Sequence, residues 1–371
     1  MGYIGYRPTW AEVDLKALEY NFHQVKAHLS PHTKILVCVK SDAYGHGIVP
    51  VSKKLVSLGV DYLGVASIDE GIALRKAGID IPILILGMVL PSDIKPILRF
   101  NLTQTVCSEE LAKVLNKTAK KYKKIANIHI KVDTGMGRLG VLYNDAFNFI
   151  EKIHRLKFLN IEGVFTHFPC ADISSSFTHY QIDIFNKLID RLRKNNIHIP
   201  LCHAANSMGV IGYRESHFNL VRPGLIIYGL YPKKNIKIRL KPVMSLKTKI
   251  VYVKRMRKGQ GLSYGHVYRT KKNTNVVTLP IGYGDGYPRG LSGKADVLIR
   301  KARFRISGRI CMDQILVDVG NVKVRIGDEA VLIGSDGQQR ITAEELAHRA
   351  ATIPYEIVCG IGNRVPRIYK D

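Results

Sequence analysis

Eight short runs of apolar and β-branched residues recur through the first part of the chain, and stretches with helical periodicity separate them. The expected strands cover 35–41, 62–67, 82–88, 102–108, 128–134, 161–167, 199–206 and 220–229. Near-continuous apolar strands that alternate with helices, such as those expected at 108–124 and 177–195, indicate a parallel sheet covered on both faces. Eight such units within about 230 residues are typical of a (β/α)8 TIM-type barrel.

The pattern changes in the last third of the chain. Between residues 240 and 334, short stretches of alternating apolar and polar residues are separated by glycine-rich turns, which predicts a mostly antiparallel β domain. A helix opened by a capping box, Thr342 with Glu345 three residues later, follows this stretch. We therefore expect an α/β protein with a barrel at 1–235 and a C-terminal β domain at 236–371.

The chain is strongly basic, with 56 lysine and arginine residues against 30 aspartate and glutamate residues and a formal net charge of +26. The basic clusters at 120–124, 254–258 and 300–305 are dispersed among regular elements, and charge runs of this kind usually form a solvated face. We therefore expect no specific nucleic-acid partner, although a non-catalytic basic binding protein stays an alternative.

Neither a membrane span nor a metal site is indicated. The longest apolar run, 83–90, is too short to cross a bilayer, which needs about 20 residues, and the N-terminal residues contain no hydrophobic signal core. The six cysteines are scattered with no C-x-x-C pair, so neither a disulfide framework nor a zinc site is expected. These features favour a cytoplasmic protein without a membrane partner.

Polar residues gather at the carboxyl ends of the expected barrel strands, which form the active face of such barrels. Lys40 ends the first strand, where partial desolvation favours a nucleophilic amine able to form a Schiff base. Taken alone, a lysine that extends to solvent is the commoner case. At equivalent places later in the chain lie Arg138, His167, Asn206, Ser207 and Arg222. The loops after strands seven and eight usually bind phosphate, and there Ser207 opens a helix and Gly224 lets backbone N–H groups approach an anion.

One segment, 135–140, fits the G-x-G-x-x-G pattern of dinucleotide-binding sites and follows an expected strand. Such a site would also need an acidic residue at the end of the next strand, whereas Glu162 stands near the start of that strand. Arg138 inside the turn also suits a carboxylate better than a closely approached pyrophosphate. An NAD-dependent oxidoreductase is therefore only a second alternative.

Several motifs resemble, in order, those of the alanine racemase family. They are VKSDAYGHG, KVDTGMGRLG, THF, HAANS, VRPG, LSYGHVY, PIGYGDGYPR, GRICMDQ and PYEIVCGIGNRVPRIY. The resemblance covers nearly the whole chain and implies a barrel followed by a β domain. It implies an isomerase that depends on pyridoxal 5′-phosphate (PLP) and interconverts L- and D-alanine, the latter a peptidoglycan precursor. A racemase of the same architecture with broader or different amino-acid preference stays open.

The resemblance also implies how the cofactor is held. Lys40 would carry PLP as a Schiff base, and Arg222 would face the pyridine nitrogen. The phosphate would be bound by Tyr44, Ser207, Tyr355 and the backbone N–H groups of Gly224 and Leu225. His167 and Asn206 complete the expected cofactor-binding residues.

Other roles implied by the resemblance concern the substrate. Lys40 and Tyr264 would be the two catalytic acid–base groups, one for each face of the substrate, with Tyr264 supplied by the partner chain of a homodimer. The substrate carboxylate would be met by Arg138, Tyr283 and the backbone N–H of Met312, and Lys131 would be carbamylated and support Arg138. Gly282 and Cys311 would line a narrow mouth. Three residues depart from the commonest pattern and leave fine specificity open, namely Asp42, Pro169 and Met208.

Overall fold

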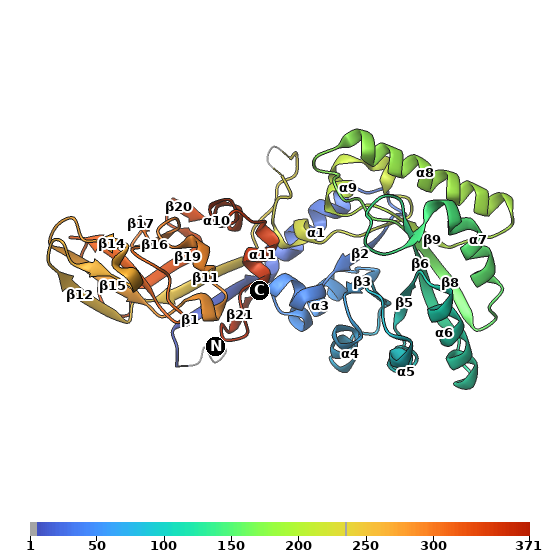
Figure 1. Cartoon of the computed structure of the whole chain (residues 1–371), viewed down its shortest axis with the longest axis horizontal. Helices are drawn as coiled ribbons and strands as arrows, with labels where there is room; N and C mark the ends of the chain where they lie inside the picture. Colours follow the sequence, from blue (N-terminus) through green and yellow to red (C-terminus); the bar gives the residue numbers. More distant parts are fainter. Residues whose placement is uncertain (1–5, 234–235) are drawn as a thin grey trace.

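A computed structural model describes residues 6–233 and 236–371 and shows a barrel beside a β domain (Figure 1). The barrel strands are β2 (Lys34–Cys38), β3 (Tyr62–Val65), β4 (Ile83–Ile85), β5 (Thr103–Val106), β6 (Ala126–Asp133), β8 (Leu159–Phe165), β9 (Leu201–His203) and β10 (Leu220–Val221). Each overlaps one of the eight strands expected from the sequence. Several end earlier than expected, because the polar residues at their carboxyl ends belong to loops.

The barrel strands are parallel and follow the order β10-β2-β3-β4-β5-β6-β8-β9, with the two-residue β7 (Val141–Leu142) paired to β6. Backbone hydrogen bonds from Arg222 N–H to the Ala205 carbonyl (2.9 Å) and from Asn219 N–H to the Cys202 carbonyl (3.4 Å) bring the β10 segment beside β9. The sheet therefore closes on itself, and the carboxyl ends of all eight strands face one opening.

Helices surround the barrel because each connection between parallel strands must cross over on the outside. They are α1 (Leu15–Ala27), α3 (Ile48–Ser57), α4 (Ile68–Lys76), α5 (Ile94–Arg99), α6 (Glu109–Lys121), α7 (Tyr143–His154), α8 (Ser175–Lys194) and α9 (Ser207–Gly212). Ser67, Ser108 and Ser174 cap α4, α6 and α8 through their hydroxyls. Within the described residues, no helix is both long enough and apolar enough to span a bilayer.

The β domain consists of mostly antiparallel sheets. Its main sheet has the order β17-β16-β19-β11-β1-β21, in which β1 is Thr9–Asp14, and β20 is added to β19. A second sheet has the order β12-β15-β18. The strands are β11 (Met244–Lys249), β12 (Tyr252–Met256), β13 (Gly261–Leu262), β14 (Tyr268–Arg269), β15 (Thr274–Leu279), β16 (Asp296–Ile299), β17 (Ala302–Arg305), β18 (Ile315–Gly320), β19 (Glu329–Asp336), β20 (Gln339–Ile341) and β21 (Arg367–Lys370). Helices α10 (Ala343–Ala350), capped by Thr342 as expected, and α11 (Pro354–Cys359) complete it.

The first strand of the chain, β1 (Thr9–Asp14), lies in the β domain and not in the barrel. It pairs antiparallel with β11 and parallel with β21, so both ends of the chain meet in one sheet (Figure 1). We did not expect a strand here, because partners more than 200 positions away leave no local pattern. The division expected at residue 235 lies outside the described residues and stays a prediction.

Candidate active site

A cavity of about 420 Å³ opens at the carboxyl ends of the barrel strands. It gathers every barrel residue that we expected to bind cofactor or substrate, together with one residue from α11. These are Lys40, Tyr44, Lys131, Arg138, His167, Asn206, Ser207, Arg222, Gly224, Leu225 and Tyr355. Residues scattered over more than 300 positions therefore converge on a single site.

Lys40 is followed by a turn of unusual backbone geometry. The four residues 41–44 all have left-handed φ angles, between 52° and 55°, within the short α2 (Lys40–Gly45). Each left-handed non-glycine residue costs about 1–2 kcal/mol, so the surroundings must hold the turn. Glu70 accepts the N–H of Ser41 at 2.6 Å, and the His46 ring donates from Nδ1 to the carbonyls of Ala43 (3.0 Å) and Tyr44 (2.9 Å). This turn places Lys40 and Tyr44 in the same cavity.

One end of the cavity is lined by hydrogen-bond donors suited to a phosphate. The Gly224 N–H donates to Ser207 Oγ with an N···O distance of 3.1 Å, which brings the two groups together at this end. A Cβ at position 224 would lie 2.6 Å from Tyr44 Oη, so only glycine allows this close approach. Burial raises the pKa of Tyr355 to about 12 and also raises that of Tyr44, which keeps both hydroxyls neutral and able to donate. The described groups fit the phosphate of PLP.

Asn206 has a different role from the phosphate donors. Its side-chain oxygen accepts the N–H of Gly209 at 3.0 Å, and its amide donates to the Phe168 carbonyl at 3.2 Å. Asn206 is the N-cap of α9, so it positions Ser207 at the start of that helix.

Arg222 lies fully within the protein beneath the cavity. It donates to the carbonyls of Thr166 (2.7 Å) and Ala204 (3.0 Å), to His203 Nδ1 (2.8 Å) and, more weakly, to His167 Nδ1 (3.4 Å). Burial lowers its pKa to about 10, so the guanidinium stays charged at neutral pH. Burial, followed by the charge of Arg222, lowers the pKa of His167 well below its usual range, and this histidine is therefore neutral.

Lys131 and Arg138 both line the cavity, and Lys131 is buried near the end of β6. Its ammonium donates to the Val132 carbonyl at 3.1 Å and lies 5.2 Å from the centre of the Phe165 ring. Burial, then repulsion by Arg222, lowers the pKa of Lys131 to about 7, and Arg138 adds to this repulsion. Much of the Lys131 amine is therefore uncharged at neutral pH.

The glycine-rich loop 135–140 is organised by one carboxylate. Asp133 Oδ1 accepts the N–H groups of Gly135 (2.8 Å), Met136 (2.8 Å) and Gly137 (3.2 Å), and its Oδ2 also accepts that of Gly137 (2.9 Å). These amides are thus used within the loop and do not form a pyrophosphate cradle. The geometry argues against the dinucleotide alternative.

Three expected site residues of the β domain do not reach this cavity within one chain, in contrast to Tyr355 of α11. Tyr264 is 68% exposed, Tyr283 41% and Met312 53%, and none of them lines the cavity around Lys40. Tyr264 lies between β13 and β14, and β14 is at the end of the β domain far from the barrel (Figure 1). A single chain therefore contains only part of the expected site.

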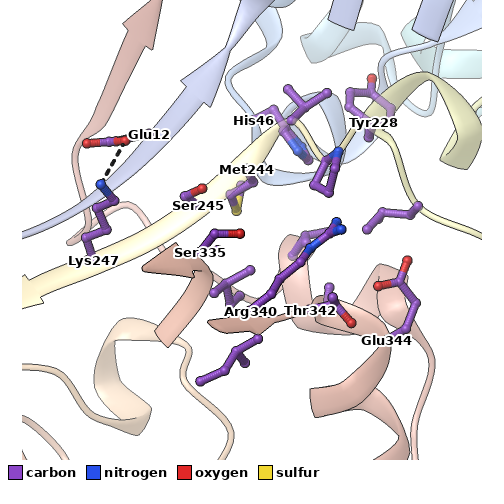
Figure 2. Close-up of a pocket in the computed structure, with 18 residues that line it drawn as sticks. Glu12, His46, Tyr228, Met244, Ser245, Lys247, Ser335, Arg340, Thr342 and Glu344 are labelled. Atoms are coloured by element: carbon purple, nitrogen blue, oxygen red, sulfur yellow. Dashed lines mark ion pairs between the residues drawn. The ribbon is translucent and has the colours of Figure 1, made fainter. Parts of the chain in front are cut away.

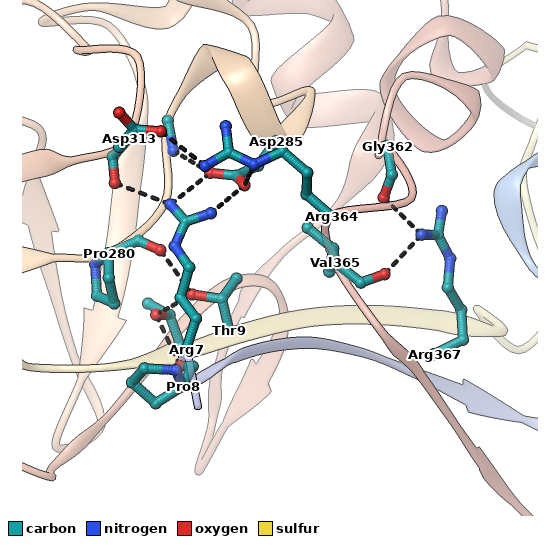
Figure 3. A network of polar contacts seen from close by, with 12 residues as sticks. Arg7, Pro8, Thr9, Pro280, Asp285, Asp313, Gly362, Arg364, Val365 and Arg367 are labelled. Atoms are coloured by element: carbon teal, nitrogen blue, oxygen red, sulfur yellow. Dashed lines mark hydrogen bonds and ion pairs between the residues drawn. The ribbon is translucent and has the colours of Figure 1, made fainter. Parts of the chain in front are cut away.

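A buried acidic residue that we did not anticipate, Asp285, supports the turn that carries Tyr283. Figure 3 shows Asp285 beside Arg7 and Arg364. Asp285 is fully buried, forms an ion pair with Arg7, lies 3.6 Å from Arg364 Nε, and accepts the Gly282 N–H at 2.8 Å. Within this turn, the Tyr283 N–H donates to the Cys311 carbonyl (3.1 Å), and the Gly284 N–H donates to the Met312 carbonyl (2.9 Å). A Cβ at Gly282 would lie 2.2 Å from the Cys311 carbonyl oxygen, so the two loops touch through their backbones.

Comparison with known proteins assigns both parts of the chain. The family described as "Alanine racemase, N-terminal domain" matches residues 13–232, and "Alanine racemase, C-terminal domain" matches residues 243–369. The chain belongs to the alanine racemase family. An alanine racemase of Halothermothrix orenii is 48% identical over 369 residues, covering 98% of this chain and 97% of the relative. One of Carboxydothermus hydrogenoformans is 44% identical over 368 residues, covering 98% and 100%.

Solved structures of alanine racemases have the same architecture. That of Clostridium difficile 630 superposes with a TM-score of 0.93 at 39% identity, covering 98% of this chain and 96% of the other. That of Bacillus anthracis, with bound L-Ala-P, has a TM-score of 0.93 at 36% identity and covers 99% and 96%. The barrel plus β-domain fold, the racemase activity and the dependence on PLP expected from the sequence are thereby confirmed.

The racemase barrel also contains a chain of connected polar side chains that we did not predict. Arg222 donates to His203 Nδ1, His203 Nε2 contacts His129 Nδ1 at 2.8 Å, and His129 Nε2 contacts Glu162 Oε2 at 3.3 Å. Burial lowers the pKa of both histidines, so each is neutral and carries its proton on Nε2. Every hydrogen bond then points from Arg222 toward Glu162, which lies inside β8 and not near its start. The sequence offered one signal for this arrangement, namely that His129 and His203 lie within otherwise apolar strands.

Proposed function

We propose that this chain racemises alanine with two acid–base groups, Lys40 on one face of the substrate and Tyr264 on the other. The observation that carries the proposal is the convergence of Lys40, Arg222 and the phosphate donors of Tyr44, Ser207 and Gly224 on one cavity. A phosphate-bearing, amine-reactive cofactor fits this set of groups. Bound there, PLP supplies an electron sink that makes the α-proton of an amino acid acidic.

Arg222 limits which reactions of the bound substrate this site favours. An arginine cannot give up its proton under these conditions, so Arg222 would donate a hydrogen bond to the ring nitrogen of bound PLP without protonating it. Its hydrogen bonds to Thr166, Ala204 and His203 fix its orientation. A weaker electron sink favours rapid return of the proton over side reactions such as transamination.

Each proton-transfer group acts from its own side. Lys40 Nζ would accept or return the α-proton on one face. Tyr264 Oη serves the other face, and His167 Nε2–H, with Nδ1 already facing Arg222, can stabilise the tyrosinate by a hydrogen bond. Arg138, with Tyr283 and the Met312 N–H, would hold the substrate carboxylate. Tyr264, Tyr283 and Met312 must then come from a second chain, so the active form is a homodimer with shared sites.

A panel assay tests the proposed activity directly. The purified protein should exchange the α-proton of L- and D-alanine for deuterium and interconvert the two enantiomers, and other amino acids should react more slowly because the mouth is narrow. Proton NMR in D2O and chiral chromatography measure the two processes. Equal rates on amino acids with large side chains would contradict alanine as the substrate, and exchange without interconversion would contradict the two-sided mechanism.

Lys131 is proposed to carry a carbamate that supports Arg138. The uncharged Lys131 amine attacks carbon dioxide at carbon, forming an N–C bond and releasing one proton, and the product is an anion. The negative charge of the carbamate replaces a cation that would repel Arg138. The carbamate oxygens also accept hydrogen bonds from the Arg138 guanidinium. The lowered pKa and the burial of Lys131 support this modification because the reaction requires the neutral amine.

Removing Lys131 should therefore weaken substrate binding. We expect Lys131→Ala to raise the KM for alanine about tenfold, because Arg138 loses a charge-assisted support. Added acetate should lower this raised KM part of the way back.

In the wild-type protein, the KM for alanine should also rise as the pH falls through about 7, because the protonated amine of Lys131 cannot react with carbon dioxide. The control is Lys117→Ala on the exposed face of α6. A carbon-13 spectrum with labelled bicarbonate that lacks a carbamate signal would contradict the modification.

A further inference from the structure

Arg7 joins the two loops of the β domain that carry Tyr283 and Met312. Its guanidinium forms an ion pair with Asp285 through both terminal nitrogens, with Nη2 at 2.8 Å from Oδ2, and Nη2 also donates to the Asp313 carbonyl at 2.9 Å. Asp285 lies two residues after Tyr283, and Asp313 directly follows Met312. One planar guanidinium therefore fixes the spacing of the two loops (Figure 3).

Arg364 strengthens the same connection from another part of the chain. Its Nη2 donates to Asp313 Oδ1 at 2.7 Å, and its Nε lies 3.6 Å from Asp285 Oδ1. The Gly362 N–H also donates to the backbone carbonyl of Asp285 at 2.9 Å. The two arginines and two aspartates balance in charge, and both terminal nitrogens of Arg7 are engaged. This cluster therefore holds the loops in place and does not itself bind an anion.

The segment that carries Arg7 is fixed to the β domain. Thr9, two residues later, is buried, and its Oγ1 donates to the Pro280 carbonyl at 2.8 Å. Further along β1, Glu12 forms an ion pair with Lys247 of β11 at 3.3 Å (Figure 2). Arg7 is therefore held in place and restrains the loops that it contacts.

The cluster has a buried base and an exposed face. Asp285 is fully buried, and its carboxylate requires these partners because burying an unpaired charge is strongly unfavourable. Tyr283 and Met312, by contrast, are exposed, as groups that meet a second chain must be. The base thus determines where two exposed groups lie relative to each other.

We propose that Arg7 is a positioning residue for the substrate carboxylate and acts on the active site of the partner chain. The inference rests on the proposed function, in which Tyr283 and the Met312 N–H meet the carboxylate at a site whose Lys40 belongs to the other chain. Arg7 fixes the distance between these two groups and so determines how tightly the carboxylate is held. The carboxylate is bound both before and during proton transfer, so Arg7 affects KM and not kcat.

The first test uses Arg7→Lys, which keeps the charge but replaces the planar fork that spans both loops. In the PLP-loaded homodimer, this variant should raise the KM for alanine about fivefold with little change in kcat. Inhibition by propionate, which has the carboxylate but no amine, should weaken by a similar factor. Inhibition by ethylamine, which lacks the carboxylate, should stay unchanged, whereas a general distortion of the site would weaken both inhibitors.

The second test places Arg7→Lys on one chain of a mixed dimer. In a dimer of Lys40→Ala and Tyr264→Phe chains, the single intact site takes Lys40 from one chain and Tyr264 from the other. Arg7→Lys on the Lys40→Ala chain should raise the KM of this site about fivefold, because that chain supplies the two loops. The same substitution on the Tyr264→Phe chain lies beside the inactive site and should leave the KM unchanged.

A matched control and a reference make the result interpretable. Arg300→Lys changes an arginine that pairs with Asp328 at 2.9 Å elsewhere in the β domain, and it should keep the wild-type KM. An inactive mixed dimer without any change at Arg7 would contradict the shared sites of the proposed function. With an active reference, an unchanged KM for both placements, an equal rise for both, or equal weakening of propionate and ethylamine would each overturn the role of Arg7.

Discussion

Replacing Lys40 with alanine should abolish both the visible absorbance of bound PLP and racemisation. The proposed function gives this one amine two tasks, the covalent hold on the cofactor and proton transfer at one face. Proton transfer alone usually contributes about 10²- to 10⁴-fold to a rate, and loss of the covalent hold adds to this. Absorbance spectra and the rate of D-alanine formation measure the two losses in one preparation.

A matched lysine variant separates this effect from a general loss of charge. Lys53→Ala removes an exposed lysine of α3, away from the cavity, and should retain colour and activity. Borohydride reduction of the wild-type protein followed by peptide mapping should place the pyridoxyl group on Lys40. Its appearance on another lysine would show that Lys40 has been assigned the wrong role.

Mixing two inactive variants, Lys40→Ala and Tyr264→Phe, should restore about a quarter of the wild-type activity if sites are shared between chains. Random exchange of subunits makes half of the dimers heterodimers, and each heterodimer has one site with both intact residues and one site with neither. The physical basis is the exposure of Tyr264 and its absence from the Lys40 cavity within one chain. Activity is measured before and after exchange, which is verified by native mass spectrometry.

The double variant provides the complementary control. Mixed in equal amounts with wild-type chains, Lys40→Ala/Tyr264→Phe should lower the measured activity by about half, because each heterodimer then has no intact site. If each site were built from a single chain, this mixture would keep its activity and the first mixture would gain none. The two mixtures thus give opposite changes under the shared-site arrangement and no change under the alternative.

Much of the candidate site could be predicted because its residues lie at the ends of strands whose pattern is local. Lys40, Arg138, His167, Ser207 and Arg222 follow or lie on apolar runs, and parallel strands in a barrel bring such ends to one face. The structure places them in the same cavity. The motif resemblance extended the prediction to Tyr264, Tyr283 and Met312, which no periodicity singles out.

The sequence by itself determined the fold class, the eight barrel strands and the residue types of the cofactor site, because alternation, turn residues and motifs act over short distances. Only the tertiary structure decided that β1 joins the C-terminal sheet, that His203 and His129 connect Arg222 to Glu162, and that Asp285 holds the Tyr283 turn. These arrangements pair groups from distant parts of the chain. Their stability comes from burial, where each polar group must find a partner, and burial exists only once the chain has folded.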